Sequence, residues 1–160
     1  MKPSAIYTLL FTCLVPAVGL AADAKRMPAN ACLLEYDSQN QNYDRGGARI
    51  GTHDTTQVFT CPLIRSNVLN LNGLAALRMN VYKFVSTDFV CYAHSFDTFG
   101  SLIKAVVRDT TTTGLTAVDW GTSLNQSGPW GTYGVTCYVV GASGSNPWGD
   151  ELESLDYTEY

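Results

Sequence analysis

Two short stretches decide the fold: FVCYAH at residues 89–94 and VTCYV at residues 135–139. Both are rich in β-branched and aromatic residues, which favour strands. Because successive side chains of a strand point to opposite faces, Cys91 and Cys137 each share a face with the apolar residues of their own stretch. The alternation therefore predicts that both cysteines face the core and form a disulfide with each other.

Four of the five cysteines lie beyond the first two dozen residues. If Cys91 pairs with Cys137, elimination pairs Cys32 with Cys61, although four cysteines allow three pairings in all. A zinc site would need closely spaced ligands such as C-x-x-C, which the chain lacks. We therefore predict two disulfides and no metal site among the cysteines, as expected in an oxidising compartment.

The rest of the chain repeats the same strand and turn rhythm. A set of about eight short strands separated by turns is typical of a single antiparallel β-sandwich, so the predicted fold class is all-β. The segment at residues 65–77 is expected to cross between sheets, with the option of a helical turn at residues 74–77. The predicted strands cover residues 32–36, 56–62, 79–85, 89–95, 102–108, 115–120, 133–140 and 151–158.

The chain begins with a predicted export signal at residues 1–22. Lys2 precedes an apolar run at residues 5–15, which helix breakers and small residues follow, as signal peptidase requires. Cleavage is favoured after Ala22, with Ala21 and Ala24 as open alternatives. The run is short for a membrane span.

Cleavage would leave residues 23–160 as one β-sandwich domain, which is predicted to be secreted or periplasmic and not held by a membrane. The formal net charge of −4 becomes about −5 once Lys2 is removed. Nucleic acid and anionic membranes attract clustered Lys and Arg, so neither partner is expected for this sparsely charged, acidic chain. The acidic residues near the C-terminus are predicted to line the outer face of an edge strand. They are Asp150, Glu151, Glu153, Asp156 and Glu159.

The order of landmarks along the mature chain also suggests a relationship. An early Cys32 is followed by TCPL at residues 60–63, VCY at residues 90–92, YGVTC at residues 133–137 and YTEY at residues 157–160. This order resembles a loose group of small secreted, disulfide-containing bacterial proteins with no assigned activity. The resemblance rests on cysteine placement and strand rhythm, and it implies no activity and no functional residue.

Aromatic residues in or beside the glycine-rich loops give the best indication of binding. Exposed Trp and Tyr side chains in loops can stack on sugar rings or anchor a protein partner. The alternative is that these large rings fill the open ends of the core. The sequence therefore favours a non-enzymatic secreted module that binds glycan or an extracellular protein without a cofactor. The candidate binding residues are Trp120, Trp130, Tyr133 and Trp148.

A secreted hydrolase is the alternative function. His94 is followed closely by Asp97, and an acidic pair elsewhere could also act on a glycosidic bond. The remaining features oppose catalysis, because oxidised cysteines supply no thiolate and GASGS at residues 141–145 lacks the last glycine of a nucleophile elbow. The oxygen-rich segment at residues 37–44 lacks the residue order of a known calcium loop, so no metal is predicted there.

Overall fold

The computed structural model describes residues 23–35, 43–44, 50–52, 56–66, 73–124, 126, 129–141 and 149–160. Within them the chain forms eleven strands and one short 3-10 helix, arranged as two antiparallel sheets. The all-β sandwich predicted from the sequence is confirmed. The predicted signal segment at residues 1–22 lies outside the described residues. No helix in the described part of the chain is long and apolar enough to cross a bilayer.

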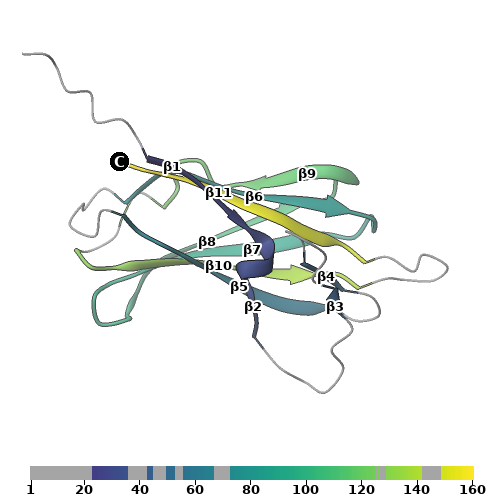
Figure 1. Ribbon diagram of the computed structural model, residues 1–160, viewed down its shortest axis with the longest axis horizontal. Helices are drawn as coiled ribbons and strands as arrows, with labels where there is room; N and C mark the ends of the chain where they lie inside the picture. Colours follow the sequence, from purple (N-terminus) through teal and green to yellow (C-terminus); the bar gives the residue numbers. More distant parts are fainter. Residues whose placement is uncertain are drawn as a thin grey trace, which may run out of the picture.

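One sheet, here called sheet A, has the strand order β3-β4-β11-β6-β9, and β1 also pairs with β11. Figure 1 shows β1, β11, β6 and β9 together in one layer. The strands of sheet A are β1 Asp23–Pro28, β3 Tyr43–Asp44, β4 Ile50–Thr52, β6 Leu74–Lys83, β9 Gly114–Asp119 and β11 Glu151–Glu159.

The second sheet, sheet B, has the order β2-β5-β10-β7-β8 and forms the other layer in Figure 1. The 3-10 helix η1 (Ala29–Ala31) carries the chain from β1 in sheet A to β2 in sheet B. The strands of sheet B are β2 Leu33–Leu34, β5 Gln57–Leu63, β7 Phe89–Phe96, β8 Leu102–Thr110 and β10 Thr132–Val139.

Both predicted disulfides, Cys32–Cys61 and Cys91–Cys137, are present, with Cα–Cα distances of 4.1 Å each. Cys91 of β7 and Cys137 of β10 lie directly opposite each other in the register of the two strands. Cys32 stands just before β2, whose first residue Leu33 pairs with Thr60, so Cys61 is its neighbour across the sheet. Each disulfide therefore joins neighbouring strands within sheet B, and neither joins sheet A to sheet B.

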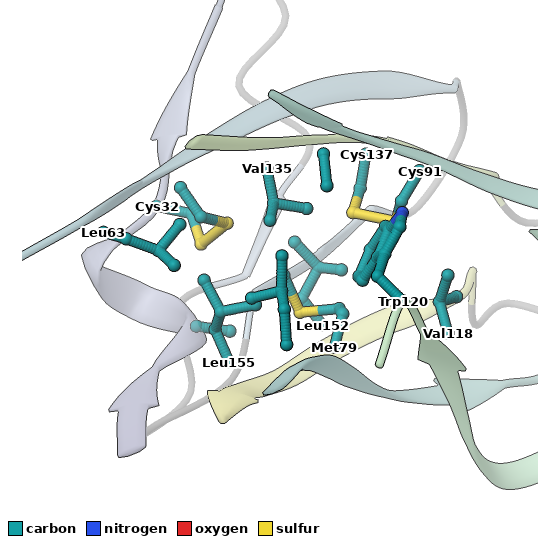
Figure 2. Close-up of a cluster of buried hydrophobic side chains, with 14 of the residues drawn as sticks. Cys32, Leu63, Met79, Cys91, Val118, Trp120, Val135, Cys137, Leu152 and Leu155 are labelled. Atoms are coloured by element: carbon teal, nitrogen blue, oxygen red, sulfur yellow. A yellow bond between two sulfur atoms is a disulfide. The ribbon is translucent and has the colours of Figure 1, made fainter. Parts of the chain in front are cut away.

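The core lies between the two layers. Figure 2 shows both disulfides and Val135, from the sheet B side, facing Met79 and Leu152 of sheet A. These side chains are fully buried. The sulfur atoms thus serve as apolar core atoms as well as cross-links, as the alternation in β7 and β10 predicts.

In sheet A one option that the sequence left open is not adopted, and one prediction is wrong. Residues 74–77 are not a helical turn but the start of β6, where an irregularity in the pairing with β11 turns both Leu74 and Leu77 inward. β11 is not an edge strand either, because β6 flanks it on one side and β4 and β1 on the other. Consequently two acidic residues of this region, Asp150 and Glu159, are buried rather than exposed.

Asp150, which was predicted to lie on an exposed edge strand, instead forms a buried ion pair with Lys83. The Lys83 Nζ donates to Asp150 Oδ2 over 3.3 Å and to the Thr87 carbonyl over 2.6 Å. Asp150 Oδ1 accepts from the backbone N–H groups of Phe84 and Val85 over 2.8 and 3.0 Å. The carboxylate therefore fixes the turn between β6 and β7 to the start of β11.

Candidate functional site

Two of the four predicted aromatic binding residues belong to the core. Trp120 is 2% exposed and its Nε1 donates to the Val106 carbonyl over 2.9 Å. Tyr133 is 3% exposed, and its hydroxyl lies against Gly73, where a Cβ would overlap it. These rings fill the core, the alternative that the sequence had left open, and present no face to a ligand.

Trp130 is different, because its side chain is 60% exposed. Its φ of 62° is the one positive φ of a non-glycine residue in the described part of the chain. The loop is attached to the turn between β7 and β8, since the Thr98 hydroxyl donates to the Pro129 carbonyl over 2.5 Å. Phe99, in that same turn, is 91% exposed. Two large rings therefore stand exposed at one end of sheet B, and Trp148 lies outside the described residues.

The outer face of β7 carries the features that the sequence interpretation missed. Buried and partly exposed residues alternate strictly along this strand. The alternation that turns Cys91 inward turns Tyr92, His94 and Phe96 outward, and Tyr138 of the neighbouring β10 also faces outward. We call these four residues the aromatic stripe. The signal was present in residues 92–96, where Tyr92, His94 and Phe96 alternate with the small residues Ala93 and Ser95.

The rings of the stripe contact one another. Tyr92 and His94 are stacked, with ring centroids 6.3 Å apart and an interplanar angle of 6°. His94 and Phe96 follow at 6.0 Å, and Tyr138 meets Tyr92 edge-on at 5.8 Å. Such pairs are held by their quadrupoles as well as by apolar burial. The stripe is thus an ordered row of rings along β7, positioned by the rigid centre of sheet B.

Small and hydroxyl-bearing side chains surround the stripe on the β10 side. Gly134 is the register partner of His94, so no side chain stands beside the imidazole there. Thr136 is the partner of Tyr92, and its hydroxyl lies 3.2 Å from the hydroxyl of Thr60 on β5. Two threonine hydroxyl groups therefore lie on the β10 side of Tyr92.

The pKa of His94 is displaced from its ordinary value. Burial lowers the pKa of the imidazole below 6.5, and the negative charge of Glu35 partly offsets this effect. The ring is therefore neutral at pH 7, where it can stack without the cost of a buried charge.

The hydrolase alternative finds no assembled site in the described residues. His94 forms no hydrogen bond or ion pair with a carboxylate there, and the Asp97 Oδ1 instead accepts from the backbone N–H groups of Phe99 and Ser101, each over 2.8 Å. This carboxylate shapes the turn between β7 and β8 and does not orient the imidazole. Among the described residues, no group of three or more His, Cys, Asp or Glu side chains could hold a metal ion.

No protein-family model and no curated protein sequence matches the chain. Solved structures do resemble it in fold. A family two carbohydrate esterase from Cellvibrio japonicus matches 87% of the chain with a TM-score of 0.51 and 8% identity. The chain spans 34% of the length of that esterase.

Two smaller proteins give weaker likenesses that cover nearly their whole length. The C-terminal CBM6 of LamC from Zobellia galactanivorans has a TM-score of 0.47 and 15% identity, over 86% of this chain and 100% of its own. The xylan-binding module CBM86 from Roseburia intestinalis has a TM-score of 0.47 and 11% identity, and the match covers 84% of this chain and 94% of that module. At 8% identity the likeness to the esterase shows the sandwich fold alone, and these two weaker likenesses add nothing to it.

Proposed function

We propose that this chain is an exported β-sandwich module that binds a neutral glycan on the outer face of sheet B. The observation that carries the proposal is the aromatic stripe. The solvent-facing side of an antiparallel sheet is ordinarily polar, and contiguous apolar surface on a protein commonly marks a binding site. Here that face instead presents four rings in mutual contact, with the exposed side chains of Leu33 and Val107 on the same face.

The chemistry of a sugar fits this surface. A pyranose ring has an apolar face of C–H groups, which can stack on Tyr, His or Phe, and a rim of hydroxyl groups, which needs hydrogen-bonding partners. The stripe supplies the rings, and the hydroxyl groups of Thr60, Thr136 and Tyr138 lie beside them. A few well-placed polar groups beside an apolar surface are the usual composition of a ligand site.

The charge on the outer face of sheet B favours neutral over acidic glycans. Among the described residues, the charged groups associated with this face are Glu35, whose field reaches His94, and Asp109, the partner of Val90. Both are negative and exposed, so a polysaccharide rich in uronic acids would be repelled. A neutral polysaccharide is therefore the expected ligand.

Two further features support the proposal. The exposed Trp130 holds a backbone conformation that non-glycine residues rarely adopt, and such strain is commonly found at functional sites. The esterase that shares the fold shows that this architecture occurs in a carbohydrate-active protein. The two disulfides are typical of a protein that matures in an oxidising compartment, as the export signal at residues 1–22 would require.

The test is retardation of the oxidised protein in gels containing neutral polysaccharides, with polygalacturonate as the acidic comparison. Tyr92→Ala should weaken the binding by about 30-fold, the effect of removing a central anchor. Tyr82→Ala is the matched control, because it removes the same side chain from the outer face of sheet A. Absence of wild-type binding to every neutral polysaccharide, or equal loss in both variants, would refute the proposal. Trp130→Ala measures the contribution of the sheet end separately.

A further inference from the structure

The outer face of sheet A carries a row of alternating charges across four strands. Arg26 of β1 is the register partner of Asp156 on β11, which is also opposite Arg78 on β6. Arg78 in turn is opposite Asp119 on β9. Arginine and aspartate therefore alternate across the sheet, and we call these four residues the charge row. No sequence pattern could reveal it, because each member comes from a different strand.

Part of the charge row is locked in place. Arg26 donates Nε and Nη2 to the two Asp156 oxygens over 2.7 and 2.9 Å. Asn80 Nδ2 donates to Asp156 Oδ2 over 2.8 Å and to the Ser154 hydroxyl over 2.9 Å. The bonds from Arg26 hold the pKa of Asp156 below its usual value, so the carboxylate stays ionised at neutral pH. Polar groups fixed in this way need little reorganisation when a ligand binds.

The other half of the charge row has hydrogen-bonding capacity to spare. Arg78 is exposed and forms no hydrogen bond or ion pair with any other residue that the structure describes. Asp119 uses Oδ1 to accept from the backbone N–H of Gly121 over 2.7 Å, which leaves Oδ2 for another donor. A guanidinium fork and a carboxylate oxygen are thus available side by side on neighbouring strands.

The surface is hollowed beside the charge row. The next register row consists of Ala24, Thr158 and Ala76, three small side chains that form the floor of a hollow of about 420 Å³. A second hollow of about 350 Å³ shares Arg26 and Arg78 with the first and continues toward the exposed Leu115. Both arginines therefore line both hollows, and we call the two hollows together the groove.

We propose that this groove is a second ligand site, independent of the aromatic stripe, and that it takes an uncharged polyhydroxylated ligand such as a neutral sugar unit. A hydroxyl group both donates and accepts, so it matches a surface on which donors and acceptors alternate. A carboxylate ligand would meet Asp119 and Asp156, and a cationic ligand would meet the two arginines. The groove thus recognises hydroxyl groups by hydrogen bonds, whereas the stripe would recognise sugar faces by stacking.

The experiment is a two-dimensional NMR titration of the oxidised protein with glucose, galactose, mannose and xylose, with glucuronate and glucosamine as charged comparisons. We expect at least one neutral sugar to shift backbone resonances of β6 and β9 near Arg78 and Asp119. Arg78→Ala should weaken that binding about tenfold, and Arg78→Lys should restore it only in part, because lysine keeps the charge but loses the fork. Both substitutions are at an exposed site and leave the core intact.

The result separates this site from the stripe. Tyr92→Ala should leave the sugar-induced shifts at β6 and β9 unchanged, whether or not the stripe binds polysaccharide. The proposal is overturned if no neutral sugar shifts these resonances. It is equally overturned if glucuronate or glucosamine binds there more tightly, or if Arg78→Ala binds as well as the wild type.

Discussion

Each sheet of this sandwich is stabilised internally by a different kind of interaction. Sheet B carries both disulfides on its inner face and the aromatic stripe on its outer face. Sheet A contains no disulfide among its described strands, but it has the buried Lys83–Asp150 pair and the charge row. Reduction should therefore act on sheet B, and removal of one member of an ion pair should act on sheet A, within one small domain. The same contrast gives the two outer faces different proposed modes of sugar recognition, stacking on sheet B and hydrogen bonding on sheet A.

Reduction of both disulfides is expected to have the largest effect. The bridges close loops of 29 and 46 residues, so losing them should cost about 3.5 and 4 kcal/mol in the chain-entropy account. That sum is comparable with the whole stability of a typical domain. Urea unfolding with and without reductant, with thiols counted by mass spectrometry, measures the loss. Hydrogen exchange should show β7 and β10 losing protection before β6 and β11. An unchanged midpoint in fully reduced protein would remove the contrast between the sheets.

Asp150→Ala tests the ionic side of the comparison. It leaves the buried Lys83 ammonium without its counter-ion and two backbone N–H groups without an acceptor, so we expect a loss of about 3–5 kcal/mol in urea unfolding. Asp150→Asn keeps an oxygen for the N–H groups and isolates the contribution of the charge. Asp88→Ala, in the exposed turn nearby, is the control and should change stability by less than about 0.5 kcal/mol. Equal effects at the two positions would contradict the assignment.

The fold could be predicted where burial follows a period of two, and it was missed where the period breaks. In β7 every inward position is apolar or cysteine, so the strand and its disulfide follow from the sequence. In β6 an irregular pairing brings Leu74 and Leu77 to the same side of the sheet. Their spacing of three residues in the sequence is typical of a helix, so the strand was not recognised there. β1 was missed because its six residues, mostly exposed, lack an apolar face and pair only with β11.

The pH dependence of stability should sharpen the comparison further. The pKa of Asp156 is lowered in the folded state by its hydrogen bond with Arg26, so its contribution is fully present above 3.8 and is lost as the pH falls through the folded-state pKa. The effect should be modest because the Arg26 side chain is 72% exposed. Thermal unfolding measured from about pH 5 down to about pH 2 should show a shallower decline in stability for Asp156→Asn than for the wild type. Asp109→Asn on sheet B is the control. If it made the decline in stability equally shallow, that result would argue against a specific role for Asp156.

The smallest expected effect belongs to sheet B. Burial lowers the pKa of His94, so the unfolded chain takes up a proton near 6.5 before the folded chain does. Stability should therefore decline as the pH falls from about 6.5 to the folded-state pKa and then level off. His94→Gln should flatten this part of the profile, and NMR titration of the imidazole gives the folded value. A folded pKa at or above 6.5 would contradict the partly buried, stacked geometry.

The candidate sites were harder to predict than the fold, for a physical reason. Trp120 and Tyr133 stand near glycine-rich loops in the sequence, yet their large apolar areas are worth more in the core, where both are buried. The aromatic stripe was accessible from the alternation in residues 89–94, because the outward face is the complement of the core face. The charge row depends on the register of four strands, which single-sequence patterns do not determine.

The pairing of β1 with β11 also bears on how the domain would respond to force. Asp23 and Glu159 are register partners at one end of an antiparallel pair, so the two ends of the described chain leave the sheet side by side. Tension applied between them would load the ladder hydrogen bonds one after another, beginning at this pair, instead of shearing them all together. Peeling of this kind meets little resistance. Under load, β1 should therefore detach first, while the cross-linked strands of sheet B remain folded behind it.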